Sequence, residues 1–213
     1  MTGRMPVPVV PHFSDALVVL DFFGIAVFAV SGALLAAEKR QTLVTFIFFA
    51  VVTGVGGGTL RDLLIGAPVF WVRSNITLLI CIGAALVVWL VSSKRFSARA
   101  LDWFDAAGLA AYATYGSAKA LGYGVAPVPA FAMGVLTACV GGIVRDVLAG
   151  QPSILMRPEL YVTAAALAAG VFVGLTLAGS AMWPAAAAAA LLGFTLRGLA
   201  IARGWSLPAY RDT

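Results

Sequence analysis

The sequence GGGTLRDLLIGAP at residues 56–68 recurs as VGGIVRDVLAGQP at residues 140–152. The same offset of 84 residues aligns 21–73 with 105–157 without a gap, and 17 of these 53 positions are identical. Self-similarity at a fixed spacing indicates that one structural unit occurs more than once in a chain. The sequence therefore predicts two related halves.

The chain has the composition of a membrane protein. Of its 213 residues, 62% are hydrophobic and 11% are charged, and its mean hydropathy is +1.00. Soluble domains are about half apolar and about one quarter charged. A transmembrane helix takes roughly 20 apolar residues, and runs of about that length occur at residues 17–37, 42–65, 75–91, 101–121, 128–149, 159–177 and 185–202. These runs predict an all-α integral membrane protein with seven transmembrane helices.

The side-chain inventory argues against an enzyme. The single histidine, His12, lies in a Pro-rich leader, so imidazole catalysis and the common metal sites are not expected in the membrane body. Cys81 and Cys139 lie in apolar runs and are expected to be small core or lipid-facing residues rather than a disulfide pair. We therefore expect no catalytic residue, no metal and no cofactor, although bound lipid is compatible with the sequence. The net charge of +5 comes from basic residues scattered between the spans, so nucleic acid is not an expected partner.

Each repeat contains three predicted spans, so the second repeat begins at the membrane face opposite to the first. This arrangement is an inverted-topology repeat, and proteins built in this way place their transport path between the two halves. The predicted division is a leader at 1–16, a first three-helix repeat at 17–93, a second, inverted one at 94–178, and a seventh helix with the C-terminal tail at 179–213. The seventh helix has no repeat partner, so we expect it to pack outside the repeats or to support an oligomer.

Loop charges predict the orientation in the membrane. An odd number of spans places the two termini on opposite sides. One side collects Lys39, Arg40, Lys94, Arg95, Arg99, Arg157, Arg203 and Arg211, and the other side has Arg4, Arg73 and Lys119. Because cytoplasmic loops carry an excess of Lys and Arg, the N-terminus is predicted to lie outside and the C-terminus in the cytoplasm.

Glycines interrupt the second and fifth spans at equivalent depths. They are Gly56, Gly57 and Gly58 in the second span and Gly141 and Gly142 in the fifth. Glycine in a helix interior costs about 1 kcal/mol relative to Ala, so these positions predict a bend or a break in each helix. Because freed carbonyls within a membrane must be buried by protein or line a wet cavity, matching interruptions favour a path between the two helices. Close helix packing at small residues is the alternative.

An Arg-Asp pair follows the glycines in each repeat, as Arg61-Asp62 and Arg145-Asp146. An ionised side chain at the bilayer centre costs roughly 2.5–3.5 kcal/mol on insertion scales, so these groups need water or one another. Adjacent helical residues point about 100° apart, which favours pairing across the pseudo-two-fold axis, Arg61 with Asp146 and Arg145 with Asp62. Lining of the pore and snorkelling of the arginines to the headgroups are the alternatives.

Three further charges lie in the predicted spans. Asp21 and Asp105 occupy equivalent positions near the N-termini of their helices, where capping explains them. If those helices border the path, these carboxylates would also concentrate cations at its two mouths. Lys119 replaces Leu35 of the first repeat and is either a snorkelling interfacial lysine or a charge that responds to voltage.

The two blocks GGGTLRDLLIG and GGIVRDVLAGQP, on the second and fifth of seven spans, resemble the prokaryotic members of the trimeric intracellular cation (TRIC) channel family. Its repeat unit is also known as a glycine transporter domain. The resemblance implies a homotrimer in the prokaryotic inner membrane, with one pore per subunit between the inverted repeats, conducting potassium and sodium. Kinked second and fifth helices would shape that pore at Gly56, Gly57, Gly58, Gly141 and Gly142. The candidate for the gating charge of the fourth helix is Lys119.

Two other functions fit the same sequence. Broken helices could bind a small zwitterion such as glycine, with half-helix N-termini at its carboxylate, in a secondary transporter with alternating access. The chain could also be an assembly subunit without transport. The channel is the main hypothesis.

Overall fold

The computed structural model describes residues 15–91 and 99–208. Within this part of the chain, α1 spans Asp15–Glu38, α2 Leu43–Leu64, α3 Asn75–Leu90, α4 Ala100–Gly122, α5 Pro127–Leu148, α6 Val162–Leu177 and α7 Met182–Arg203. Short 3₁₀ turns follow α2 at Phe70–Arg73 and α5 at Ile154–Met156. The prediction of an all-α protein with seven spans is confirmed. His12 and most of the predicted leader, together with Lys94, Arg95 and Arg211, lie outside the described residues.

The helix ends agree with the prediction to within three residues. The largest differences are at the starts of α6 and α7. α6 begins at Val162, later than predicted, because Glu159 is extended and forms an antiparallel bridge with Ser206. α7 begins at Met182, earlier than predicted, because Pro184 fits in the first turn of a helix, where its missing N–H has no helical partner to lose.

Most of the described helices are long or apolar enough for a bilayer, and they differ in both properties. Among those described, α1, α2, α5 and α7 are each long and apolar enough to cross a membrane, and α3 and α6 are shorter apolar helices. α4 is less apolar, but its residues from Asp105 to Lys119 are almost all buried within the protein. α4 is therefore shielded from lipid by the other helices.

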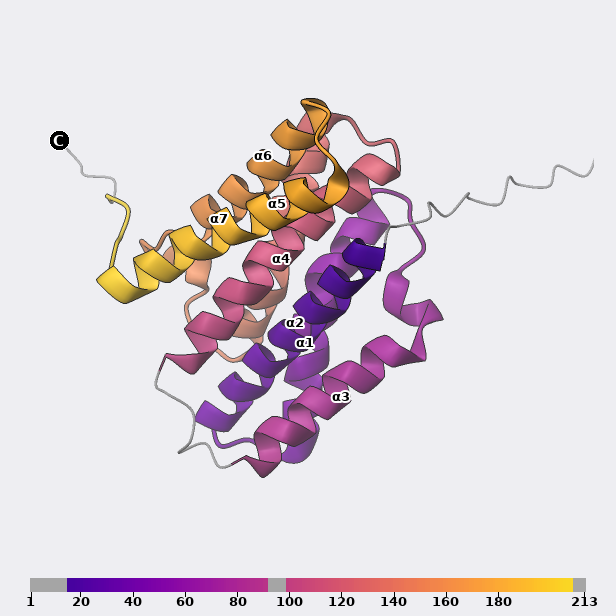
Figure 1. Cartoon of the computed structure of the whole chain (residues 1–213). Helices are drawn as coiled ribbons and strands as arrows, with labels where there is room; N and C mark the ends of the chain where they lie inside the picture. Colours follow the sequence, from indigo (N-terminus) through magenta and orange to yellow (C-terminus); the bar gives the residue numbers. More distant parts are fainter. Residues whose placement is uncertain (1–14, 92–98, 209–213) are drawn as a thin grey trace, which may run out of the picture.

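Helices α1 and α4 form the centre of the molecule. α1 packs against α2, α3 and α4, whereas α4 packs against α1, α5, α6 and α7. Figure 1 shows α3 on one side of this centre and α6 with α7 on the other. The two central helices meet at Phe28 and Tyr112, whose ring centroids are 5.4 Å apart. These two residues occupy equivalent positions of the repeat, so the pseudo-two-fold axis passes near this contact.

The same symmetry relates the rest of the two halves. α2 and α5 contact each other across the axis. Each ends at a glycine with positive φ, Gly66 at 67° and Gly150 at 66°, the left-handed conformation that commonly ends helices. The fold is thus two inverted three-helix repeats with α7 added against α4 and α6. The exact boundaries given above for the repeats stay predictions.

Candidate functional site

Helices α2 and α5 are in close contact at their glycines. A Cβ on Gly57 would overlap the carbonyl group of Thr137, and a Cβ on the equivalent Gly141 would overlap the carbonyl oxygen of Thr53. A Cβ on Gly56 would lie 3.6 Å from the Cα of Gly141. Of the predicted bend or break, the break is wrong, because both helices are continuous through these residues, and a bend stays a prediction. Their glycines instead allow two backbones to approach, as small residues do in membrane helix pairs.

Beyond the glycines, each helix ends in a buried charge cluster. The α2 cluster consists of Asp21, Arg61, Asp62 and Lys119, and the α5 cluster of Asp105, Arg145 and Asp146, with Ser31. Lys119 and Asp105 are both on α4, 14 residues apart, which is about 21 Å along a helix. That spacing also returns to nearly the same helix face. The two clusters therefore lie towards opposite ends of one side of α4.

The α2 cluster is centred on Asp62. The Asp62 carboxylate lies 2.8 Å from Nη2 of Arg61 and 2.8 Å from Nζ of Lys119. It also accepts a hydrogen bond of 3.1 Å from the backbone N–H of Phe70 in the following turn. The Arg61 guanidinium lies over the Tyr115 ring, 5.1 Å from its centroid. Arg61 is 1% exposed and Lys119 is 5% exposed, so both cations bind the Asp62 carboxylate inside the protein.

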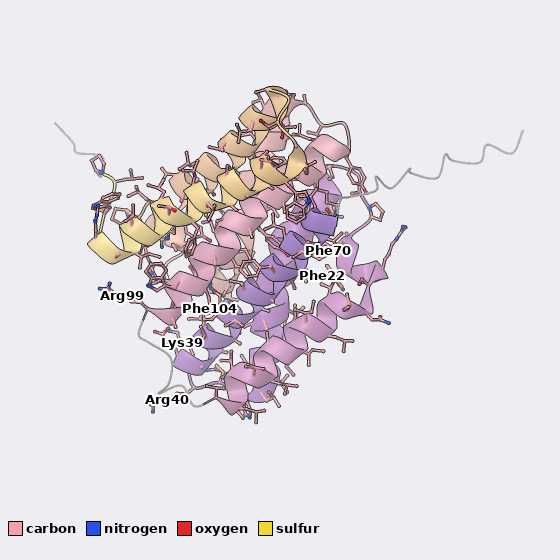
Figure 2. The ribbon with its side chains drawn as sticks, viewed as in Figure 1. Phe22, Lys39, Arg40, Phe70, Arg99 and Phe104 are labelled. Carbon is pink, nitrogen blue, oxygen red and sulfur yellow. The ribbon has the colours of Figure 1, made fainter. Side chains whose placement is uncertain are left out.

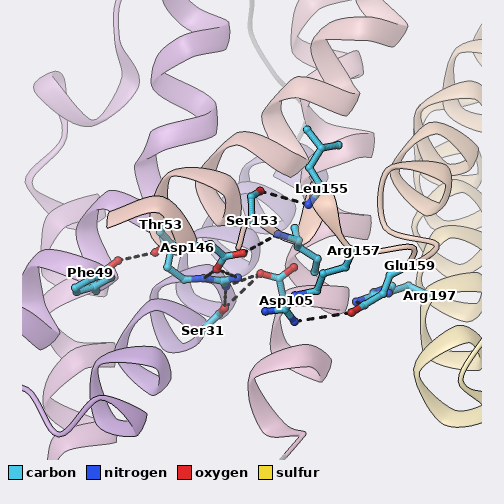
Figure 3. Close-up of polar contacts among 12 residues, drawn as sticks. Ser31, Phe49, Thr53, Asp105, Asp146, Ser153, Leu155, Arg157, Glu159 and Arg197 are labelled. Carbon is cyan, nitrogen blue, oxygen red and sulfur yellow. Dashed lines mark hydrogen bonds and ion pairs between the residues drawn. The ribbon is translucent and has the colours of Figure 1, made fainter. Parts of the chain in front are cut away.

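The α5 cluster is centred on Arg145. Its guanidinium lies 2.8 Å from the Asp146 carboxylate and 2.6 Å from Asp105 of α4. It also donates to the Ser31 hydroxyl of α1. Asp146 accepts from the backbone N–H of Ile154 at 3.0 Å, as Asp62 does from Phe70. In Figure 3, Ser31, Asp105 and Asp146 converge from separate helices.

The clusters differ in charge. The α2 cluster holds two cations and two anions, whereas the α5 cluster holds one cation and two anions. A cavity of about 400 Å³ reaches the α5 cluster and is lined by Glu38, Leu101, Asp102, Arg145, Asp146, Gln151, Pro152, Ile154 and Arg157. Asp21 Oδ1 and Asp105 Oδ2 are buried and form no close hydrogen bond in the described structure, although the hydroxyls of Tyr115 and Tyr161 lie beside these carboxylates. In each cluster, one carboxylate oxygen can therefore still accept a hydrogen bond or contact a cation.

Comparison with known proteins identifies the family. The model of the glycine transporter family matches residues 18–93 and 102–176. The structure resembles that of the trimeric intracellular cation channel orthologue from Rhodobacter sphaeroides, with a TM-score of 0.87 and 40% identity over 90% of this chain and 100% of that one. The chain belongs to the TRIC channel family.

Other members of the TRIC family support the same assignment. A prokaryotic TRIC channel crystallised in 0.5 M KCl has a TM-score of 0.83 and 27% identity, over 90% of this chain and 98% of that one. A Vibrio cholerae protein named UPF0126 membrane protein is 43% identical over 162 residues, which are 75% of this chain and 67% of that one. The UPF0126 inner membrane protein YadS of Escherichia coli K12 is 40% identical over 148 residues, 68% of this chain and 72% of that one. The structural neighbours are channels, so the prediction that the chain is not an enzyme is confirmed.

The predicted pairing across the axis is wrong. Arg61 does not pair with Asp146, nor Arg145 with Asp62; each arginine bonds the aspartate next to it in sequence. An angle of 100° between adjacent residues does not prevent this contact, because an arginine side chain is long enough to fold back in the last turn of a helix. The second partner of each pair comes from α4, which the repeat pattern did not reveal.

Snorkelling is also excluded for these groups. Arg61 and Arg145 are each 1% exposed, and Lys119 is held by Asp62 rather than extended to the headgroups. Ser31 was not singled out from the sequence, although the offset of 84 residues places it opposite Tyr115, which contacts the other cluster. Within the described residues, no three His, Cys, Asp or Glu side chains are arranged to hold a metal ion.

Proposed function

We propose that this protein is a homotrimeric, potassium-permeable cation channel of the prokaryotic inner membrane, with one path in each subunit. The path runs beside α1, α2, α4 and α5, from the α2 cluster to the α5 cluster. The observation that carries the proposal is the pair of equivalent carboxylates, Asp21 and Asp105, each with a buried oxygen that forms no close hydrogen bond in the described structure. Buried ionisable groups in a membrane protein mark ion pathways because they are costly elsewhere.

Charge balance makes such a path compatible with cations. Arg61 and Arg145 alone would repel a cation, but each is neutralised by an adjacent aspartate within 2.8 Å. The α2 cluster, with Lys119 and Asp21, is then neutral overall, whereas the α5 cluster keeps one negative charge in excess, which attracts cations to that end. In the arrangement described here, the ion pairs occupy both ends, so conduction requires that they separate.

Lys119 is the proposed gating charge. Its ammonium group is bound to Asp62 at the end of α4, and its repeat equivalent, Leu35, is uncharged. Moving one charge through the full membrane potential is worth about 2.3 kcal/mol per 100 mV. Displacement of this lysine by voltage would release Asp62 and open the α2 end.

The proposed orientation places the α5 cluster near the cytoplasm. Figure 2 shows Lys39, Arg40 and Arg99 at the end of the molecule opposite to Phe70 of the α2 side. An excess of basic residues marks the cytoplasmic side. The N-terminus is then outside, and the α2 cluster faces outwards.

Reconstitution tests the channel directly. Purified protein in liposomes should carry a potassium flux and should give single-channel currents in planar bilayers. Matched liposomes without protein are the control, and size measurement in detergent should give a trimer. Folded protein that passes no potassium would contradict the proposal.

Secondary transport of glycine is the alternative, favoured by the description of the matching family model. The same liposomes distinguish the two functions. Saturable uptake of labelled glycine driven by an ion gradient, without unitary currents, would favour the transporter. Unitary currents without glycine uptake are the expected result.

A further inference from the structure

Helix α7 lies outside the repeats but carries a buried charge. Arg197 is 1% exposed, whereas Arg203 in the last turn of α7 is exposed. Nη2 of Arg197 lies 2.5 Å from Oε2 of Glu159 in the loop before α6, as Figure 3 shows. The guanidinium also lies over the ring of Tyr161, 5.5 Å from its centroid. A buried charge in an apolar helix is costly, which makes Arg197 a candidate functional residue.

Tyr161 connects this arginine to the α5 cluster. The Tyr161 side chain is 1% exposed, and its hydroxyl faces Asp105 and Arg145. A Cβ on Gly142 would lie 2.9 Å from that hydroxyl oxygen, so the glycine provides the space that the tyrosine occupies. One aromatic ring therefore contacts the guanidinium of α7 on its face and the α5 cluster at its hydroxyl.

Within the described residues, the α2 cluster is not linked to a helix outside the repeats. Its own tyrosine, Tyr115, lies under an arginine of the cluster itself and not under an arginine of a further helix. The repeat equivalent of Tyr161 is Thr77, and no described helix packs on the first repeat as α7 packs on the second. The α2 cluster is instead held by Lys119, whose equivalent beside the α5 cluster is Leu35. The two ends of the path are thus closed by different groups.

The loop that carries Tyr161 is fixed by several contacts with α7 and its C-terminal extension. Glu159 bridges Ser206, and the N–H of Leu207 donates to the carbonyl of Pro158 at 2.8 Å. Arg157 lies 3.8 Å from Glu159 at the exposed edge, and Asp102 of α4 is a further charged neighbour. A shift of α7 must therefore move the loop before α6.

We infer that Arg197 is a positioning residue for the α5 cluster: by holding Tyr161 against Asp105 and Gly142, it keeps the inner end closed and couples α7 to conduction. This inference rests on the proposed channel function. Its mechanical part, the closure of the α5 cluster by α7, can be tested without any current.

The two native cysteines provide that test. Cys139 of α5 is 4% exposed and lies within electrostatic range of Asp105 and Tyr161, whereas Cys81 of α3 is fully buried away from this site. The probe is a trimethylammonium-ethyl methanethiosulfonate reagent, and mass spectrometry of the full-length protein follows modification of each cysteine. Arg197→Gln should speed labelling of Cys139 by roughly tenfold, as expected when local opening no longer breaks a charge-assisted hydrogen bond. Labelling of Cys81 should stay at the wild-type rate.

Two variants serve as controls. Arg203→Gln removes an exposed arginine of the same helix and should leave both labelling rates unchanged. Arg197→Lys keeps a cation beside Glu159 and should label at Cys139 more slowly than Arg197→Gln. The inference is overturned if Cys139 labelling in Arg197→Gln matches wild type, if Cys81 speeds up equally, if Arg203→Gln has the same effect, or if the Lys variant is as fast as the Gln variant.

Single-channel recording links the labelling to function. With the inference correct, Arg197→Gln raises the open probability while the unitary conductance stays at the wild-type value. Faster labelling of Cys139 in a protein that conducts no potassium would refute the channel but leave the positioning role intact. A conducting wild type whose open probability does not respond to Arg197→Gln would refute the coupling alone.

Discussion

At the scale of single residues, the two clusters differ in what each partner contributes. Asp105 is one of two carboxylates on Arg145, and its loss leaves Nη1 of a guanidinium that is 1% exposed without its carboxylate partner, although Asp146 still balances the charge. Lys119 is one of two cations on Asp62, which keeps Arg61 and the N–H of Phe70 when the lysine is removed. Removal of one partner therefore has unequal consequences at the two ends.

Stability measurements test this inequality. Asp105→Asn should lower the free energy of unfolding by about 3–5 kcal/mol, the usual cost of breaking a buried pair. Lys119→Met should lower it by only about 1.5–3 kcal/mol, the contribution of one hydrogen bond to a charged group. Equilibrium unfolding in detergent micelles measures both. An equal loss in the two variants would contradict the pairing described here.

Lys119→Met also tests gating. Because the lysine holds the α2 end closed, its removal should raise the open probability and weaken the voltage dependence. Single-channel recording at positive and negative voltages measures the change. The control is Lys39→Met, which removes an exposed lysine in the loop after α1. A voltage dependence identical to that of wild type would show that Lys119 is not the gating charge.

Residue contacts were the least predictable part of the site. The residue types and their depth followed from the repeat and from the cost of charge in lipid. The partners did not, because the reach of an arginine and the face of α4 depend on the packed structure. Arg197 is detectable in the sequence as a lone charge within the apolar run at 185–202. The sequence does not identify Glu159 and Tyr161 as its partners.

At the scale of helices, the elements were predictable because bilayer thickness fixes the length of an apolar run. The glycines of α2 and α5 show where this reasoning fails. Low helix propensity predicted a bend or a break, but in a membrane protein close backbone contact can offset that cost, and neither helix breaks. The packing alternative, which the sequence also allowed, is the one that the structure contains at Gly57 and Gly141.

Substitution of Gly57 tests the helix contact. Gly57→Ala places a methyl group against the Thr137 carbonyl, so α2 and α5 must separate. Overpacking of this kind costs about 1–3 kcal/mol, and we expect the midpoint of thermal unfolding to fall. Gly83→Ala in α3 is the matched control, because no described atom outside the adjacent turns of its own helix lies within 4 Å of the added Cβ. A Gly57→Ala protein as stable as the Gly83→Ala protein would refute the close contact.

At the scale of the whole molecule, the repeat relates the two ends of the protein, but their charged residues differ. Lys119 and Leu35 are equivalent positions near the α2 and α5 clusters, respectively. Exchanging them, as Lys119→Leu with Leu35→Lys, moves the cation to the α5 end, where Asp146 corresponds to Asp62. The pseudo-two-fold axis then predicts that the voltage dependence reverses its polarity.

Recording from channels inserted in a known direction measures this reversal. Lys119→Leu alone is the control and should lose most of the voltage dependence. A double variant that folds as wild type does, but keeps the wild-type polarity, would show that the two ends are not functionally equivalent.

The most direct test of the central claim is the potassium conductance of Asp62→Asn and Asp146→Asn, measured in single channels of folded protein. Both aspartates neutralise an arginine beside the same proposed path, one at each end, so each change should reduce the unitary conductance. Trimer size and thermal unfolding of the same samples identify any loss of folded protein. Conductance equal to that of wild type in both variants would contradict a cation path between the two clusters.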